Sequence, residues 1–471
     1  MEKPRASSQP FISDSGIGGM GRIRGVSRKT WLCLAIACGT AGCKPPGLAG
    51  AGSGRGAVTV TIHVNAVSKA RFPDGKTWKT AFPTLAQALQ AAPDNAEIWL
   101  APGTYRARAG KLAVGEIHHR KDLRIIGGIS PDSTGAETIK PSVLDGKRGT
   151  GRVLHVLDVR DSTGISIHHV TVTGGRAGQS ADDKDAGNWG GGIFVQDSQV
   201  KLQEVTCERN EGHLGGCLGV HGQSRVEVLD STFRDNQAKK SEDLDKGLVG
   251  GDGDIAAIWP WGLGGAVAVE EDGTLSVRGS AFIDNIASAV GGAVYGNRCD
   301  LHFAEGTTFT GNRVGEGDKV GEGGAVAASH VRLTLRQATF TGNQAARGGA
   351  LHATMSSTVR VEKCGFRGNK ARGDGGAVHL ETSSGLFIAD AVFTDNTATQ
   401  NAGVLHITGD SSVAVSSSRF TGNKAGAGIC AVALVRASRW REGEGNTYAD
   451  NASSGDPMGD DSPCRPVTAA P

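Results

Sequence analysis

From Cys207 to Asn423 the chain repeats two short motifs about every 27 residues, and this period limits what the chain can fold into. The first motif is Phe-x-x-Asn, and its copies begin at Phe233, Phe282, Phe309, Phe340, Phe366, Phe393 and Phe420, with Cys207 as a variant. The second is Gly-Gly-Ala followed by Val or Leu, and its copies begin at Gly264, Gly291, Gly323, Gly348 and Gly375. A fixed period with one apolar position and one turn position per unit is typical of a solenoid, in which each unit packs on the next.

The length and composition of the unit favour a β-helix over other kinds of solenoid. About 27 residues can hold three strands of roughly 4–6 residues with their turns, which is one coil. A leucine-rich repeat would place Leu at several fixed offsets, and helical repeats need longer units with fewer glycines. This chain has 72 glycines in 471 residues and only 5% aromatic residues. The repeat therefore predicts an all-β, single-stranded parallel β-helix.

Each repeated residue has a mechanical role in such a coil. Phe should point inward and stack on the Phe of the next coil, about 4.8 Å away. Asn should sit at a bend, where it tolerates left-handed backbone and can hydrogen-bond to the Asn above and below. The Gly pair allows a sharp turn where a Cβ would clash. Because folding explains all of these residues, we assign no chemistry to them.

The segment ahead of the repeats is predicted to cap the β-helix. Residues 57–110 contain a strand with alternating apolar residues, a short amphipathic helix that Thr84 can cap, and a second, buried strand. Such a cap would protect the apolar end and the open strand edges of the first coil. We place the coils at residues 111–450 and a disordered tail, rich in Gly, Asp, Ser and Pro, at 451–471.

Residues 1–43 have the features of a bacterial lipoprotein signal peptide. A basic stretch precedes an apolar run at 31–37, which is too short to cross a bilayer but suits a signal peptide. Small residues then lead to Cys43, which we predict to be lipidated as the new N-terminus. Cys38 is the rival position, and ordinary secretion with cleavage nearby is the alternative. Residues 44–56, rich in Gly, Ala and Pro, would form a flexible tether.

The pairing of the two motifs over about residues 190–430 resembles the repeat of the chlamydial polymorphic outer-membrane proteins, within the pectin-lyase-like group of right-handed parallel β-helices. The resemblance implies right-handed coils, display at the cell surface and adhesion. Those proteins carry a C-terminal membrane barrel for export, whereas about 20 residues follow Asn451 here, so a lipid anchor would replace the barrel. The expected location is the cell envelope or cell surface, as an outer-membrane lipoprotein, with secretion as the alternative.

Three insertions interrupt the repeat just before the Gly-Gly corner, at residues 176–189, 237–263 and 313–322. Insertions at one phase of a solenoid emerge on one side, so their side chains should share one rim. Tryptophan faces and carboxylates are what a sugar chain needs from a protein surface. The candidate ligand-binding residues of this rim are Asp182, Asp183, Asp185, Trp189, Asp243, Asp245, Asp252, Asp254, Trp259, Trp261 and Asp318. The alternative is that the loops are merely solvated and that Trp259 and Trp261 pack on their own coil.

Two places in the chain contain residue types that bind metals. Acidic loops can bind calcium, but the segment 250–254 lacks the register of a glycine-rich calcium repeat because Ile255 occupies the acidic position. His352, His379 and His406 follow each other at intervals of 27 residues and should form an outward-facing ladder on neighbouring coils. Imidazoles about 4.8 Å apart suit ring stacking better than a shared tetrahedral centre. We therefore expect no cofactor and assign no metal ligand, with calcium at the acidic loops as the alternative.

Six cysteines lie beyond the targeting segment, and an even number in an exported chain permits disulfides. Their spacing fits no metal knuckle, so structural pairing or simple burial is the expected role. A bond between Cys430 and Cys464 is one candidate, because it would fasten the tail to the last coil.

Two functional classes remain after the charge balance is considered. Lys and Arg total 50 against 48 Asp and Glu, without a lysine-rich run, so a nucleic-acid partner has no support. The first class is a non-catalytic adhesion or polysaccharide-binding scaffold, whose partner is a polysaccharide or a cell surface and which meets the membrane only through its lipid anchor. The second is a lyase, hydrolase or epimerase acting on uronate-containing glycans, because many pectin-lyase-like β-helices cut such polymers. Since no outward carboxylate pair recurs beside a Lys or Arg on adjacent coils, catalytic residues stay unassigned and we favour the first class.

Overall fold

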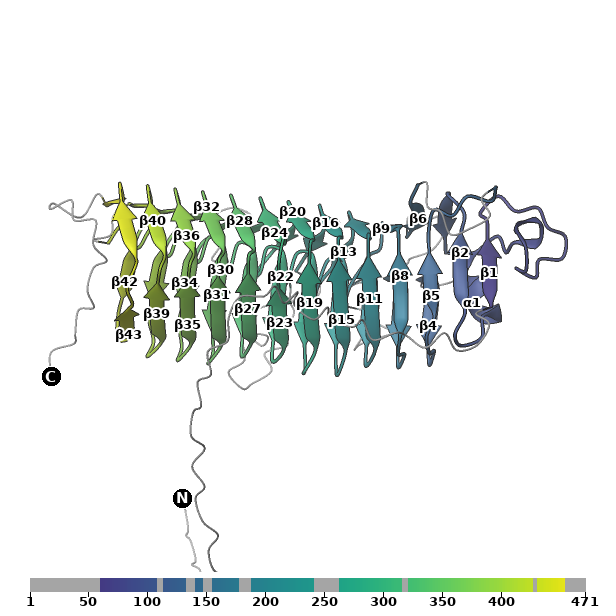
Figure 1. Cartoon of the computed structure of the whole chain (residues 1–471), viewed down its shortest axis with the longest axis horizontal. Coiled ribbons are helices and arrows are strands. Elements are labelled where there is room, and N and C mark those ends of the chain that lie inside the picture. Colours follow the sequence, from purple (N-terminus) through teal and green to yellow (C-terminus); the bar gives the residue numbers. More distant parts are fainter. Residues whose placement is uncertain are drawn as a thin grey trace, which may run out of the picture. The chain divides into compact units, whose positions relative to one another are not determined.

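The computed structural model describes residues 60–107, 113–132, 140–146, 155–177, 188–240, 262–315, 321–426 and 430–453. Within them the chain winds into successive coils, and equivalent strands of neighbouring coils pair in parallel to form four sheets (Figure 1). The helices of this part of the chain are a 3-10 turn, η1 (Trp78–Thr80), and the α-helix α1 (Leu85–Ala91). The all-β parallel β-helix that the repeat predicts is thus confirmed.

The 13-stranded sheet has one face open to solvent. Its strands, in spatial order, are β1 (Thr61–Val64), β2 (Glu97–Leu100), β5 (Arg124–Ile126), β8 (Ile165–His168), β11 (Gln199–Gln203), β15 (Arg225–Leu229), β19 (Thr274–Arg278), β23 (Asp300–Phe303), β27 (Arg332–Arg336), β31 (Thr358–Glu362), β35 (Gly385–Ala389), β39 (Ser412–Ser416) and β43 (Arg439–Glu442). Buried and more exposed residues alternate along most of these strands, as expected for a sheet with one face on the core and one face toward solvent.

The 11-stranded sheet follows each Gly-Gly corner. Its strands are β4 (Ala113–His118), β7 (His155–Arg160), β10 (Ile193–Gln196), β14 (Leu218–His221), β18 (Val267–Glu270), β22 (Val294–Asn297), β26 (Val326–Ser329), β30 (Leu351–Thr354), β34 (Val378–Leu380), β38 (Leu405–Ile407) and β42 (Ala433–Val435). Strands β22, β26 and β30 are buried at every position, so this sheet is covered on both faces.

The 12-stranded sheet carries the Phe of each Phe-x-x-Asn motif. Its strands are β3 (Thr104–Arg106), β6 (Ser142–Asp145), β9 (Val170–Thr173), β12 (Thr206–Glu208), β16 (Thr232–Arg234), β20 (Ala281–Ile283), β24 (Thr308–Thr310), β28 (Thr339–Thr341), β32 (Gly365–Arg367), β36 (Val392–Thr394), β40 (Arg419–Thr421) and β44 (Thr447–Ala449).

A fourth sheet follows each Asn and is made of two-residue strands. They are β13 (Glu211–Gly212), β17 (Gln237–Ala238), β21 (Ile286–Ala287), β25 (Arg313–Val314), β29 (Gln344–Ala345), β33 (Lys370–Ala371), β37 (Thr397–Ala398), β41 (Lys424–Ala425) and β45 (Ala452–Ser453). Each regular coil therefore contains four strands, whereas the sequence led us to expect three. Two residues between two turns show no periodicity, so sequence patterns cannot reveal such a strand.

The Phe side chains form the predicted column inside the coils. Neighbouring rings from Phe233 to Phe420 are stacked, with centroids 4.6–5.0 Å apart and interplanar angles of 10° or less. Each of these side chains is at most 1% exposed. Burying a Phe side chain contributes about 1.5–3 kcal/mol, so the column is a large part of the core energy.

The Asn side chains form a second column, in which each carboxamide is fully used. The Oδ1 atom of Asn312 accepts hydrogen bonds from the backbone N–H and the Nδ2 of Asn285, each at 3.0 Å. Its Nδ2 donates to the Phe282 carbonyl and to Oδ1 of Asn343, again at 3.0 Å. The expected Asn ladder is therefore present. It satisfies buried backbone groups at the bend that a turn would otherwise leave unpaired.

The left-handed residue at this bend is not the Asn, as we expected, but the residue before it. Asp235 and Asp284 have φ of 56° and 52°, and Gly311 and Gly342 take the same conformation in the following coils. The Asn is needed for its carboxamide, while the preceding Asp or Gly tolerates the positive φ. At the other corner the expectation holds: Gly264 has φ of 67°, and a Cβ on Gly265 would lie 2.1 Å from the Gly292 carbonyl oxygen.

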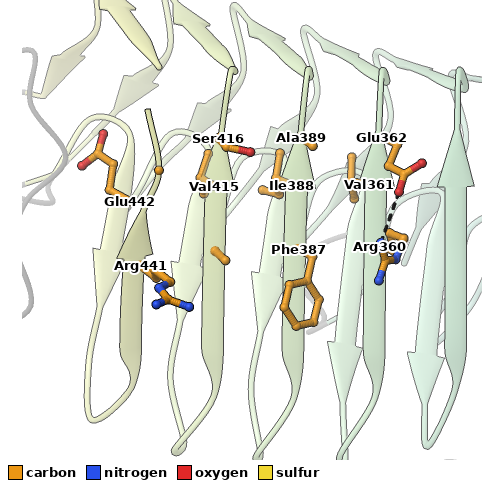
Figure 2. Close-up of a pocket in the computed structure, with 12 residues that line it drawn as sticks. Arg360, Val361, Glu362, Phe387, Ile388, Ala389, Val415, Ser416, Arg441 and Glu442 are labelled. Atoms are coloured by element: carbon orange, nitrogen blue, oxygen red, sulfur yellow. Dashed lines mark hydrogen bonds and ion pairs between the residues drawn. The ribbon is translucent and has the colours of Figure 1, made fainter. Parts of the chain in front are cut away.

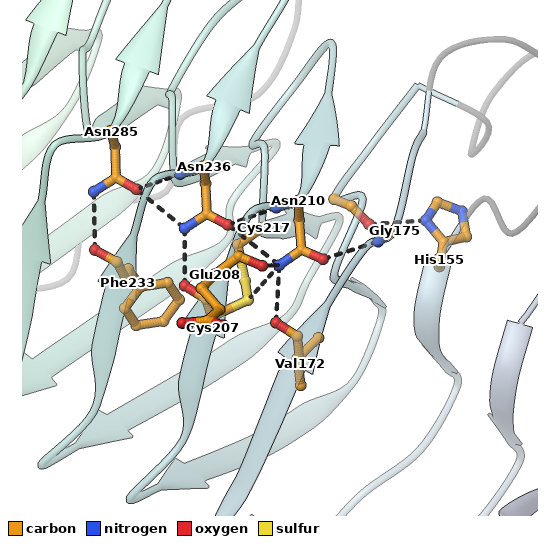
Figure 3. Close-up of a disulfide and its surroundings, with 11 residues drawn as sticks. His155, Val172, Gly175, Cys207, Glu208, Asn210, Cys217, Phe233, Asn236 and Asn285 are labelled. Atoms are coloured by element: carbon orange, nitrogen blue, oxygen red, sulfur yellow. Dashed lines mark hydrogen bonds between the residues drawn. A yellow bond between two sulfur atoms is a disulfide. The ribbon is translucent and has the colours of Figure 1, made fainter. Parts of the chain in front are cut away.

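A disulfide replaces the aromatic ring at the start of the Phe column (Figure 3). Cys207 stands in register with Phe233, and Cys217 takes the place of Ala266 at the Gly-Gly corner. Both positions point into the coil, and their Cα atoms are 6.2 Å apart. Elsewhere in the described residues, Cys299 and Cys364 are buried free thiols. Cys430 is disulfide-bonded, but its predicted partner Cys464 lies outside the described residues.

The N-terminal segment expected to act as a cap is joined directly to the coils. Strand β1 pairs with β2, and β2 pairs with β5, so the 13-stranded sheet begins inside the segment 57–110. Helix α1 has the predicted N-cap, since the Thr84 hydroxyl accepts from the backbone N–H of Gln87 at 3.4 Å. Its buried residues Leu85 and Leu89 pack into the main core.

A second, smaller core lies on the outer side of the 11-stranded sheet, and we call it the lateral core. Its residues are Trp189, Phe194, Leu214, Leu263, Ala268, Ala289, Val290, Tyr295 and Ala327. Some project from the strands of the sheet, and the others come from the segment just before each Gly-Gly corner. That segment forms its own line of parallel bridges from Trp189 through Leu263 and Val290 to Glu322 and Arg347. It is this line that covers the sheet.

Replacing Asn312 with Ala tests the Asn column. The change leaves the buried Asn285 N–H and the Phe282 carbonyl without their side-chain partners, so the free energy of unfolding should fall by about 2–5 kcal/mol. Urea unfolding followed by circular dichroism measures the loss. Thr310→Ala, an exposed change on the same coil, is the matched control, and equal stability of the two variants would contradict the role assigned to the column.

Candidate functional site

The outer face of the 13-stranded sheet presents its side chains in straight rows. Because equivalent strands pair in register, every second residue of a strand lies beside its counterparts on the neighbouring coils. The central row is Lys201, Glu227, Ser276, His302, Thr334, Arg360, Phe387, Ala414 and Arg441. A polymer lying along such a row would meet one side chain at each coil.

Basic residues predominate among the charged outward positions of this face. From β11 to β43 they are Lys201, Arg225, Arg278, Arg332, Arg336, Arg360, Arg439 and Arg441, against the acidic Glu227, Asp300 and Glu362. The whole chain is nearly neutral, so this excess belongs to the face and not to the composition. A face of this kind attracts anions.

Phe387 is the exception to the polar character of the row. It is 47% exposed, whereas the Phe of every complete Phe-x-x-Asn motif is buried. It lines a hollow of about 300 Å³ together with Arg360, one coil before it, and Arg441, two coils after it (Figure 2). The residues between Phe387 and Arg441 at this level, Ala414 and Ser416, are small, and this is why the surface is hollowed there.

The charged groups around the hollow differ in how firmly they are held. The guanidinium carbon of Arg360 lies 6.0 Å from the centre of the Phe387 ring, and its Nη1 is 3.3 Å from Oε1 of Glu362. The carboxylate of Glu362 is therefore already paired with a guanidinium of the protein. The guanidinium of Arg441 has no hydrogen bond or ion pair with any residue that the structure describes, so it is available to a carboxylate or sulfate of a ligand.

The repeat motifs did not point to Phe387, Arg360 or Arg441, although the chain contains a signal for the first. Leu386 and Ile388 fit inward positions, so the Phe between them must face outward, in a row where other coils carry polar or small residues. The two arginines stand out only after the register of the coils is known.

The predicted loop rim is largely outside the part of the chain that the structure describes. This applies to Asp182, Asp183, Asp185, Asp243, Asp245, Asp252, Asp254, Trp259, Trp261 and Asp318, for which the rim stays a prediction. Trp189 is described and is only 4% exposed, because its indole packs in the lateral core against residues such as Phe194 and Leu214. Its ring therefore supports the coil and offers no face to a sugar.

The predicted histidine ladder is present, but it is buried. The rings of His352, His379 and His406 are stacked, with centroids 5.2 and 4.9 Å apart and interplanar angles of 12° and 13°. They do point away from the main core, in the row of Tyr295, as expected. The pre-corner segment covers them, so His352 and His379 are each 2% exposed.

The covering segment changes character along the coils. Over the first coils it contributes Trp189, Leu214, Leu263 and Val290, and over the histidines it contributes Glu322, Arg347, Asp374 and Asn401. The lateral core thus passes from an apolar layer to a layer of buried histidine, carboxylate and guanidinium groups.

Burial holds the pKa of His379 well below its usual range, and the neighbouring His352, His406 and Arg347 lower it further. At neutral pH this imidazole is therefore uncharged. In the unfolded chain the same group would titrate near pH 6.5. Between these two pKa values the unfolded state binds the extra proton, so the free energy of unfolding falls as the pH decreases below about 6.5.

Replacing His379 with Phe should reduce this sensitivity to acid. Phe keeps a stacked ring but cannot bind a proton, so the loss of stability between pH 6.5 and 5 should be smaller than in the unaltered chain, by up to about 1.4 kcal/mol per pH unit. Urea unfolding at a series of pH values, with a chelator present, gives the two slopes. Thr334→Phe, which adds the same ring to the outer face of the 13-stranded sheet without removing a titratable group, should leave the slope unchanged, and identical slopes for all three proteins would contradict the assignment.

None of the helices in the described residues is long and apolar enough to cross a membrane. A family model described as "Right handed beta helix region" matches residues 265–438, which agrees with the coils seen there and gives them their hand. No curated protein matches the chain.

Solved structures with some likeness to this chain have several different activities. A rhamnogalacturonan lyase is 13% identical, with 78% of this chain and 82% of that one covered and a TM-score of 0.32. The catalytic unit of a GH87 α-1,3-glucanase from Streptomyces thermodiastaticus is 13% identical, with coverages of 84% and 70% and a TM-score of 0.34. The surface protein and adhesin PfbA of Streptococcus pneumoniae is 12% identical, with coverages of 78% and 92% and a TM-score of 0.31. At such values no activity passes from these proteins to this one, and what is established is a right-handed parallel β-helix.

Proposed function

We propose that the chain is an exported, lipid-anchored surface protein whose 13-stranded sheet binds an anionic polysaccharide without cleaving it. The observation that carries this proposal is the exposed ring of Phe387 beside a hollow that Arg360 and Arg441 flank. The repeat does not explain this exposed apolar ring, because the same position on the neighbouring coils carries a polar or small residue.

The chemistry of the hollow fits a sugar chain with acidic groups. The C–H face of a sugar ring can lie on the exposed aromatic ring, and the guanidinium of Arg441 can hold a carboxylate or sulfate in a two-pronged hydrogen bond. The rows of the sheet extend the contact over several coils, and the basic excess of the face favours an anionic polymer over a neutral one. Glu362 is held in ion pairs with Arg336 and Arg360, which suits a positioning role better than proton transfer.

Adhesion and the cell surface enter the proposal from the sequence. The repeat resembles that of surface-displayed proteins, and Cys43 follows a signal-peptide-like segment. A polysaccharide-binding scaffold fixed by a lipid chain would hold a cell to a glycan layer, with the polysaccharide or another cell as its partner. The acidic loop rim, if it lies beside the coils as expected, would add polar contacts to the same polymer.

Replacing Phe387 with Ala should weaken polysaccharide binding about two- to twelvefold, because the aromatic contact contributes about 0.5–1.5 kcal/mol. Affinity electrophoresis of the purified full-length chain in gels containing a polyuronate, a sulfated glycan or a neutral glucan measures this change. Val392→Ala is the matched control, since Val392 is also an exposed apolar residue, 44% exposed, but lies on the 12-stranded sheet.

The same panel separates the alternatives. Unchanged retention of Phe387→Ala, together with loss of retention in a Trp259→Ala/Trp261→Ala variant, would move the binding site to the loop rim. New reducing ends or unsaturated sugar ends after incubation would overturn the non-catalytic proposal in favour of a hydrolase or lyase. Failure to retain any of the three polymers would refute glycan binding by this face.

Replacing Cys43 with Ser tests the anchor. A lipid chain on this cysteine would place the protein in the membrane fraction, so Cys43→Ser should shift it to the soluble fraction while Cys38→Ser should leave it in place. Fractionation of expressing cells, with mass spectrometry of the N-terminus, reports the result. The reverse pattern would assign the anchor to Cys38, and soluble protein in every case would indicate plain secretion.

A further inference from the structure

The buried histidine ladder has a carboxylate on each side at one of its steps. His352 lies between two glutamates, with Nδ1 3.3 Å from Oε2 of Glu322 and Nε2 3.3 Å from Oε1 of Glu381. Glu322 comes from the covering segment, while Glu381 follows strand β34, which carries His379. Three separate pieces of chain thus bring their polar atoms together in a place that is otherwise closed.

His379 completes the group, and its ring stacks on His352 and His406 while its Nδ1 atom has no hydrogen bond. A ligand atom of His352, one of His379 and one of Glu381 all lie within 4.8 Å of one another. The Nδ1 atom of His379 is buried and makes no hydrogen bond, and the residue as a whole is only 2% exposed. Leaving a buried polar atom unpaired costs about 1–3 kcal/mol, so the protein itself does not use all of the hydrogen-bonding or ligating capacity of this imidazole.

We propose that His352, His379 and Glu381 form a binding site for one divalent transition-metal ion of the Zn²⁺ type. Two imidazole nitrogens and one carboxylate oxygen are a donor set that Zn²⁺ and Co²⁺ accept, whereas Ca²⁺ requires six to eight oxygens. Bonds of about 2.1 Å in a tetrahedral centre place two ligand atoms about 3.4 Å apart. The nitrogen of His352 and the oxygen of Glu381 already stand at 3.3 Å. Rotation of the His379 ring would have to bring its nitrogen at most about 1.4 Å closer to these two atoms.

Glu322 gives this site the support that metal-binding histidines usually have. A ligating imidazole commonly donates its second N–H to a carboxylate, which fixes the tautomer and leaves the other nitrogen for the metal. Glu322 at Nδ1 of His352 is placed for this role and is itself held by Arg347, whose Nη2 is 2.8 Å from Oε1. The remaining nitrogen of His352, Nε2, faces Glu381 and the proposed ion.

Charge and access are compatible with a dication. Two glutamates and one guanidinium give the cluster a net charge of about −1 when the imidazoles are neutral, so a divalent cation is attracted. The side chain of Glu381 is 25% exposed, and it provides the route by which an ion can enter and a water molecule can become the fourth ligand.

Titration of the purified, chelator-treated full-length chain with Zn²⁺ tests the site. We expect one equivalent to bind, a rise in Tm with added Zn²⁺, and visible absorption bands of a tetrahedral centre with Co²⁺. Glu381→Gln and His379→Gln should each bind Zn²⁺ at least about tenfold more weakly.

Two variants serve as matched controls. His406→Gln changes the same ladder but not the three proposed ligands, and His302→Gln removes a surface imidazole; both should keep the Zn²⁺-dependent rise in Tm. If His379→Gln does not fold, Glu381→Gln decides, because it keeps the size of a partly exposed side chain. Absence of saturable Zn²⁺ binding, Zn²⁺ affinity unchanged in Glu381→Gln, or a response to Ca²⁺ equal to that with Zn²⁺ would each overturn the proposal. Polysaccharide retention is measured separately and depends on neither outcome.

Discussion

Parallel pairing of each coil with the next is the interaction on which the rest of this structure depends. A single coil has too little apolar surface to be stable alone, so its Phe is buried only because another Phe lies 4.6–5.0 Å away on either side. The Asn column works in the same way, since each carboxamide hydrogen-bonds to the backbone of a neighbouring coil and to the Asn side chain of a neighbouring coil. Once these two columns fix the register, every outward residue also falls into a row, and these rows make up the face that we propose for binding.

The lateral core shows how the same position can serve packing or chemistry. Where the covering segment brings Leu263 or Val290, the outward residues of the 11-stranded sheet are Ala268 and Tyr295, and the layer is an ordinary apolar one. Further along the coils the covering segment carries charged residues, and the outward residues of the 11-stranded sheet are histidines. Buried charges are costly unless they are paired, so the two changes must occur together. The result is a polar cluster inside a scaffold whose backbone does not alter.

Features with a local sequence signature could be predicted, and features that depend on how distant segments come into register could not. The Phe and Asn columns, the Gly-Gly corner, the Thr84 cap and the histidine ladder all follow from local spacing. The partners of the ladder do not, because Glu322 is the last residue of an insertion of irregular length and its place over His352 depends on the full register. Trp189 was expected at a loop rim but lies in the lateral core for the same reason. Phe387 was overlooked, although the inward positions of Leu386 and Ile388 made its outward phase readable.

The in-register rows have a consequence for how such a face can change. Distances between outward side chains along the molecule come in whole steps of the coil pitch, and Phe387 and Arg441 are two steps apart. Duplication or loss of one coil between them would alter that separation by one step and leave both columns continuous. The distance between two contacts on this face therefore changes only when a whole coil is gained or lost. The side chain at each step changes with a single codon. The length of the face and its selectivity for a ligand can thus evolve independently of each other.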